Sequence, residues 1–101
     1  MPDCLFLMHD DAAALGGDES GGDWGSYIGG LQASGNFQGG GAMGAGVCER
    51  KSGAAPAVSG HLTGFICIRA DSLDDARRLL VGNPVFEAGG TVEIRELPKT
   101  D

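Results

Sequence analysis

The chain has 101 residues, with seven Lys or Arg, fourteen Asp or Glu and a formal net charge of −7. Residues 1–49 hold seven of those acids and no Lys or Arg. This excludes a binder of nucleic acid or anionic membrane, because such binding needs clustered basic side chains. The length suits a single domain over residues 1–101, long enough to bury roughly two-thirds of its unfolded surface.

The apolar segments and the cysteines bear on location and cofactors. No apolar run approaches the roughly 20 residues that cross a bilayer, and residues 1–8 (MPDCLFLM) lack the basic lead of a signal peptide. We therefore expect a cytoplasmic protein. Cys4, Cys48 and Cys67 are an odd number without metal-site spacing. Cys4 and Cys67 lie in apolar strand-like runs, so we interpret them as small buried hydrophobes rather than as disulfide partners. Composition indicates no metal and no cofactor.

The first third of the chain predicts a strand and a helix. Residues 4–8 (CLFLM) are apolar at successive positions, which is typical of a strand buried on both faces in the centre of a sheet. A loop is expected over residues 10–23. Trp24, Tyr27, Ile28 and Leu31 then recur at three- and four-residue steps and predict a helix from about residue 22 to residue 33, ended by Gly35.

The middle of the chain is rich in glycine, and fifteen of the nineteen glycines lie at or before Gly60. Residues 39–44 (GGGAMG) predict a bend or a bulged strand. Residues 46–50 and 57–58 are candidates for two further short strands. We expect this region to form an irregular hairpin.

Residues 60–97 carry the clearest pattern. Residues 65–70 (FICIRA) predict a buried strand. Ser72, with an acid three residues later, is a helix-start signal, and Asn83-Pro84 should end that helix at Gly82. Residues 91–97 alternate between polar and apolar and predict a half-exposed strand nearer an edge of the sheet.

The order of these elements predicts an α+β fold. Strand, helix, irregular hairpin, strand, helix and strand is the split βαβ pattern of the ferredoxin-like fold, with an antiparallel sheet. Two helices can cover only one face of such a sheet. The other face is expected to carry Leu5, Leu7, Phe65 and Cys67, so we predict a C₂ homodimer packed sheet against sheet.

The chain resembles the YCII-related family, in the branch of DGPF-domain proteins. The resemblance rests on residues 5–11 (LFLMHDD), 64–76 (GFICIRADSLDDA) and 83–94 (NPVFEAGGTVEI). It spans nearly the whole length and implies a dimeric α+β barrel. Residues 52–55 (SGAA) stand where the family usually has Asp-Gly-Pro-Phe, so only Gly53 of that motif is kept.

His9, Asp10 and Asp11 are the candidate catalytic residues. They end the first predicted strand, where side chains can reach a cleft. A carboxylate beside an imidazole fixes its tautomer, which is the minimum for general acid or base catalysis. The alternative is a hydrogen-bonded strand end without chemistry. A metal site at these residues lacks a third ligand of suitable spacing.

Four further residues are candidates for ligand binding. His61 can meet His9 if their strands are neighbours, although its place after a turn also predicts a simple exposed side chain. Arg69 and Arg95 fall on the predicted barrel-facing side of their strands, where they can hold a small anionic molecule or pair with neighbouring glutamates. Trp24 either belongs to the core or walls a pocket.

Two functions are open. The resemblance implies a family of mostly uncharacterised proteins, in which a few members resemble small enzymes with a His–Asp pair in the barrel cleft, most clearly a dehydrochlorinase-type lyase. The first function is therefore small-molecule binding with lyase-type acid–base chemistry. DGPF-domain proteins also resemble companions of extracytoplasmic-function sigma factors. The alternative is a non-catalytic accessory or regulatory protein that acts in signalling and docks a protein partner through its acidic N-terminal half.

Overall fold

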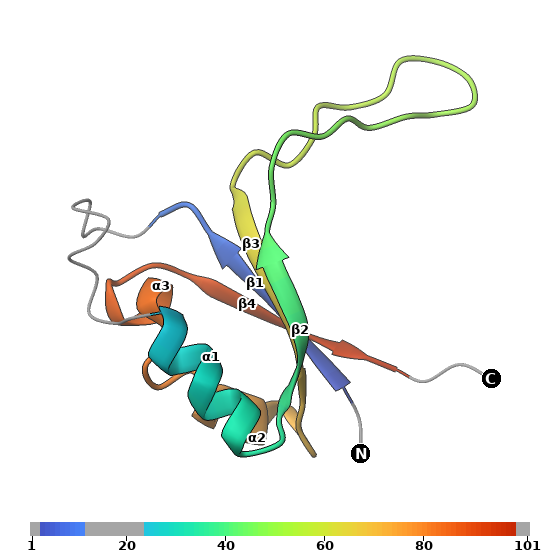
Figure 1. Ribbon diagram of the computed structural model, residues 1–101. Helices are drawn as coiled ribbons and strands as arrows, with labels where there is room; N and C mark the ends of the chain where they lie inside the picture. The colour runs from blue at the N-terminus through green and yellow to red at the C-terminus, as the bar shows by residue number, and fades with distance from the viewer. Residues whose placement is uncertain (1–2, 12–23, 99–101) are drawn as a thin grey trace.

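The computed structural model describes residues 3–11 and 24–98, which form an α+β fold of four strands and three helices (Figure 1). The elements in chain order are β1 (Asp3–His9), α1 (Trp24–Ala33), β2 (Phe37–Ala42), β3 (Leu62–Arg69), α2 (Leu73–Arg78), α3 (Pro84–Glu87) and β4 (Val92–Leu97). Residues 12–23, which hold most of the expected loop and the first two residues expected in that helix, lie outside the described residues. Within the described part, no helix is long and apolar enough to cross a membrane.

The strands form one antiparallel sheet in the order β2-β3-β1-β4. The central place of β1 and the edge place of β4 are both as predicted. Strand β1 pairs with β3 on one side, with Leu5 opposite Cys67, and with β4 on the other, with Leu5 opposite Arg95. The strands belong to two strand–helix–strand units, one from β1 to β2 and the other from β3 to β4. Strand β3 lies between the two strands of the first unit, and β1 lies between those of the second.

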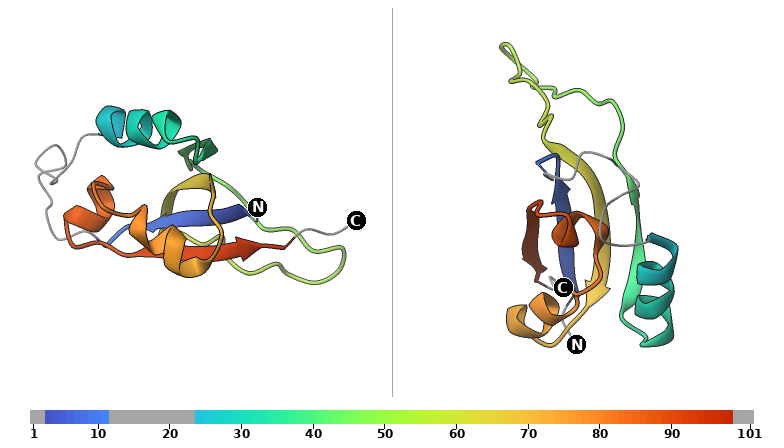
Figure 2. Two further views of the ribbon diagram at one scale, coloured as in Figure 1. Left: turned by 90° about the horizontal axis from the view of Figure 1, so that it is seen from below. Right: turned by 90° about the vertical axis from the view of Figure 1, so that its left-hand side faces the viewer.

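The helices cover one face of this sheet, and the core lies between the helices and that face (Figure 2). In β1 the buried side chains are Cys4, Phe6 and Met8, and in β3 they are Ile66 and Ile68. Tyr27 and Leu31 of α1 and Ala76 of α2 close the same cluster. Alternate residues thus face the helices, as the period of a β-strand requires.

The other face of the sheet is apolar at its centre, as the sequence predicts. Leu5, Leu7, Phe65 and Cys67 alternate with the core residues and are half-buried. We call this surface the open face, because none of the described helices covers it. Cys4 is in the core, Cys48 and Cys67 are half-buried, and all three cysteines are free.

The second helical region differs from the prediction. Ser72 is the N-cap of α2, and its hydroxyl accepts from the backbone N–H of Asp75 at 3.1 Å, as predicted. However, α2 ends at Arg78, and a second short helix, α3, follows where only a stop was expected. Asn83 is fully buried, and its side-chain oxygen accepts from two backbone N–H groups of α3. Because proline suits the first position of a helix, Asn83-Pro84 starts a helix as well as preventing the earlier one from continuing.

Strand β2 is bulged, as predicted, but the two further strands are not present. Gly39 has a φ of 143°, and the pairing of β2 with β3 shifts register there. Residues 46–50 and 57–58 form no strand. Instead residues 43–61, which we call the arm, run out from the sheet and return to it (Figure 1). The glycines of this segment offer no side chains for packing, and its proline has no backbone N–H to donate to a neighbouring strand. These two features explain why no regular strand pairing forms.

Candidate functional site

The polar end of β1 forms a hydrogen bond with β4. His9 Nε2 lies 3.0 Å from Oε1 of Glu93, and the two side chains are 21% and 35% exposed. Leu7 is opposite Glu93 in the sheet, and the backbone N–H of His9 donates to the carbonyl of Thr91. His9 and Glu93 are therefore diagonal neighbours on the open face, which is a distance that side chains of this length bridge.

Glu93 is held by a second partner. Nη1 of Arg95 donates to its other carboxylate oxygen, Oε2, at 3.3 Å. The hydrogen bond from His9, and then the one from Arg95, lower the pKa of Glu93 from its ordinary value. Glu93 is thus ionised at neutral pH, and because an ionised carboxylate can only accept, Nε2 of His9 carries the proton.

His61 completes this cluster. Its ring centre lies 4.9 Å from that of His9, with the two planes at 68°, which is an edge-on contact. The carbonyl of His61 accepts from the backbone N–H of Asp10 at 2.7 Å. Both expectations for His61 hold, since it is exposed and also beside His9. We call His9, His61, Glu93 and Arg95 the histidine cluster.

Neither Asp10 nor Asp11 is the hydrogen-bond partner of His9. Asp10 is exposed. The carboxylate of Asp11 accepts from the backbone N–H of Thr91 at 2.8 Å and from its hydroxyl at 2.7 Å. These two bonds are the main cause of a lowered pKa at Asp11. Asp11 thus fixes the chain before β4, while the carboxylate beside the imidazole comes from Glu93, 84 residues away in sequence.

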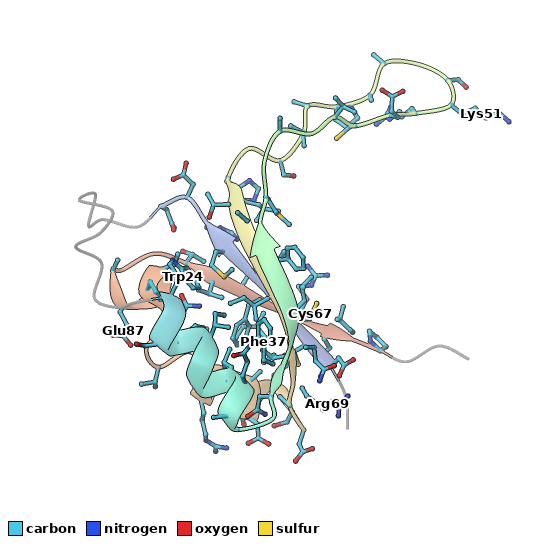
Figure 3. The ribbon with its side chains drawn as sticks, viewed as in Figure 1. Trp24, Phe37, Lys51, Cys67, Arg69 and Glu87 are labelled. Carbon is cyan, nitrogen blue, oxygen red and sulfur yellow. The ribbon has the colours of Figure 1, made fainter. Side chains whose placement is uncertain are left out.

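Arg69 and Arg95 do not share a site. Arg69 is opposite Asp3 at the far end of β1, with its Nε 4.0 Å from the Asp3 carboxylate and its Nη2 3.5 Å from the Gln38 side-chain oxygen. Figure 3 shows Arg69 at the end of the sheet away from Trp24. The expected pairing with a glutamate occurs at Arg95, which pairs with Glu93 of its own strand, whereas Arg69 pairs with Asp3 instead. Only Arg95 belongs to the histidine cluster.

Trp24 walls a pocket. It is the first residue of α1, is 42% exposed, and meets the ring of Tyr27 edge-on at 6.1 Å. Beside it lies a cavity of about 380 Å³ on the helix-covered side of the sheet. The cavity is also lined by Met8, Ala42, Gly64, Ile66 and Val85. It is separate from the histidine cluster, because Met8 points to the helices and His9 to the open face.

Among residues 3–11 and 24–98, no three His, Cys, Asp or Glu side chains are placed to hold a metal ion. No family model matches the chain, and no curated protein or solved structure matches it either. Function is therefore inferred from the geometry of the chain's own residues.

Proposed function

We propose that the protein is a homodimeric, YCII-related protein of ferredoxin-like topology whose histidine cluster performs acid–base chemistry on a small anionic molecule. The observation that carries this proposal is the 3.0 Å contact between His9 Nε2 and Glu93 on the open face. A carboxylate that receives the proton of one ring nitrogen leaves the other nitrogen as the base. Nδ1 of His9, which has no hydrogen-bond partner among the described residues, is the nitrogen that would take a proton.

The neighbouring side chains suit a lyase-type reaction. Nδ1 of His9 would remove a proton from a carbon next to a carbonyl or carboxyl group. The electron pair of that C–H bond then forms a double bond, and a leaving group departs with its own electrons. Arg95 lies beside Glu93 and can hold the substrate's carboxylate, because a guanidinium pairs well with a planar anion. His61, next to His9, can protonate the departing group.

A second copy of the chain is the partner that this site requires. His9, Glu93 and Arg95 share the open face with Leu5 and Leu7, which water would otherwise contact. A partner seated there would bury the apolar side chains and exclude water from the cluster, which strengthens every polar contact within it. The ferredoxin-like reading is supported by the strand order β2-β3-β1-β4.

The test is a survey of small carboxylates in deuterated water. Proton NMR would follow 2-oxo acids, 3-hydroxy acids and 3-chloro acids for loss of a C–H signal or for elimination. We expect His9→Gln and Glu93→Gln to lose at least about 100-fold in rate, the range of a single acid–base group. Asp10→Asn is the matched control, since Asp10 is an exposed neighbour. Full turnover by folded His9→Gln would overturn the assignment.

One observation favours the alternative of an accessory protein. The arm exposes Met43, Val47 and Val58, and Val47 is 78% exposed. Apolar side chains on a projecting segment are typical of a protein-binding surface. If the wild-type protein leaves every carboxylate unchanged and a crosslinker placed in the arm captures one specific foreign protein, the accessory function replaces the catalytic one.

A further inference from the structure

We propose that the cavity beside Trp24 is a second binding site, distinct from the histidine cluster, and that it takes a neutral, flat, apolar molecule of two or three aromatic rings. The cavity lies between α1, α3 and the ends of β2 and β3. It is on the face of the sheet opposite His9. It therefore stands independently of the proposed acid–base chemistry.

The size of the cavity sets the size of the ligand. Its volume is about 380 Å³. An apolar protein cavity of about 150 Å³ holds one benzene ring, and small-molecule pockets begin at about 300 Å³. The space beside Trp24 therefore exceeds what one ring needs and suits a fused or linked ring system.

The chemistry of the walls sets the charge of the ligand. Met8, Ile66 and Val85 contribute aliphatic and thioether surface, and the described lining includes no charged side chain. Its only side-chain hydroxyl is that of Thr63, whose weak bond to the carbonyl of Met8 spans 3.4 Å. An anionic ligand would lose its hydration here without gaining a cation, which is costly.

The aromatic wall is held in place before any ligand arrives. Tyr27 packs edge-on against Trp24, and its hydroxyl donates to the carbonyl of Leu79 at 2.7 Å. This bond anchors α1 to the chain after α2 and so fixes the indole. A positioned indole that is 42% exposed offers a surface for ring stacking without the cost of ordering it on binding.

Two glycines make the floor of the cavity from bare backbone. Gly41 and Gly64 both line it, and Ala42 is opposite Gly64 in the sheet. A side chain at Gly64 would start 3.2 Å from the carbonyl oxygen of Gly41 and 3.5 Å from the Met8 methyl group. The open space thus depends on small residues at these positions. A large side chain at position 42 would lie over Gly64 and fill it.

The test uses N-phenyl-1-naphthylamine, a neutral dye whose emission rises in apolar surroundings. Trp24 is the only tryptophan of the chain, so energy transfer from it to the dye reports binding beside it. We expect saturable quenching of Trp24. 1-Anilinonaphthalene-8-sulfonate has the same rings and a negative charge, and should bind about tenfold more weakly or worse. Equal affinity for the two dyes would overturn the proposed ligand class.

Cavity-filling variants locate the dye. Ala42→Phe should weaken the neutral dye about tenfold or more. Ala45→Phe is the matched control, because Ala45 is exposed in the arm and does not line the cavity. Val85→Phe fills the same space from α3 if Ala42→Phe fails to fold by circular dichroism. Unchanged binding in a folded filling variant overturns the site.

Two more variants separate this site from the others. Leu5→Ser changes the open face and should leave dye binding intact. Loss of dye binding in this variant would place the dye on the open face and contradict the proposal. His9→Gln should also bind the dye as the wild type does. A chain that binds the dye but turns over no carboxylate would retain this site and lose the proposed acid–base function.

Discussion

Asp11 and Glu93 are the two carboxylates of the polar end of the sheet whose pKa values are lowered. At Asp11 the cause is two hydrogen bonds from Thr91, and at Glu93 it is those from His9 and Arg95. A carboxylate with a lower pKa in the folded than in the unfolded chain stabilises the fold above its ordinary pKa. That contribution is lost as the pH falls through the folded-state value.

This gives a prediction for Asp11→Asn. The variant keeps the size of the side chain but loses the charge that accepts from Thr91. We expect it to be less stable than the wild type at neutral pH, and the difference to shrink as the pH falls below the ordinary value of 3.8. Urea midpoints measured across this range check the prediction. Asp10→Asn is the control, and a gap for Asp11→Asn that stays constant with pH would contradict it.

At this scale the sequence identifies His9 but not its partner. Asp10 and Asp11 were the natural choices because they follow His9 directly. Glu93 was recognisable only as an acid that alternates with Val92 and Ile94 on an edge strand. Register between β1 and β4 decides the pairing, and a single sequence contains no direct signal of register.

Caps and glycines determine where the elements begin, end and approach one another. The pattern in residues 60–97 predicts β3, the start of α2 and β4 well, because apolar period and a Ser cap are local signals. The sequence does not predict α3, and it wrongly suggests short strands at residues 46–50 and 57–58 in the arm. A four-residue helix has no measurable period, and strand propensity without a partner strand does not form a ladder.

Asn83→Ala should expose the dependence of α3 on its cap. Asn83 is fully buried and accepts from both Val85 and Phe86, so we expect a loss of about 1–2 kcal/mol in the free energy of unfolding. Ser72→Ala is the comparison, since that exposed cap accepts one bond, at 3.1 Å, and should cost about 0.5–1 kcal/mol. Denaturant unfolding measures both. Equal losses would show that the buried cap has no special role.

Gly40→Ala tests the close approach of β2 to β3. A methyl group at position 40 would lie 2.5 Å from the carbonyl oxygen of Phe65 and 3.0 Å from Cα of Ile66, and neither backbone atom can move away cheaply. We expect a loss of about 1–3 kcal/mol. Gly41→Ala meets nothing within 4 Å and should be neutral or stabilising by up to about 1 kcal/mol. If the two variants unfold at the same denaturant concentration, β2 does not depend on this contact.

The molecule as a whole is extended for its size. Its radius of gyration is 14.9 Å, against about 13 Å for a compact domain of this length. Its surface of 6489 Å² exceeds the roughly 5,400 Å² of an ordinary monomer of this mass. The arm and the open face are both surfaces that the described helices leave uncovered. In the proposed homodimer, a second copy would cover both at once if the two-fold axis sets each arm against the body of the other chain.

The charge of the arm predicts which surface of the second copy it would contact in such a dimer. Arg50 and Lys51 stand at its tip against one acid, Glu49, so the arm carries +1 and the rest of the chain −8. Figure 3 shows Lys51 at the far end of the arm, away from the sheet. Opposite charges on arm and body attract between two copies as they do within one, and that attraction weakens with salt. We therefore expect a dimer that loosens as ionic strength rises.

Reversing the two charges at the tip is the decisive test of that arrangement. Arg50→Glu with Lys51→Glu should shift the wild-type mass from twice 10.3 kDa towards a single chain in light scattering at micromolar concentration. Arg77→Glu with Arg78→Glu changes the net charge equally, but at α2, where both arginines pair with acids of their own helix. This control should remain dimeric, since exposed pairs of that kind contribute little. If both double variants dissociate alike, net charge rather than the arm governs assembly, and a monomeric wild type would remove the dimer altogether.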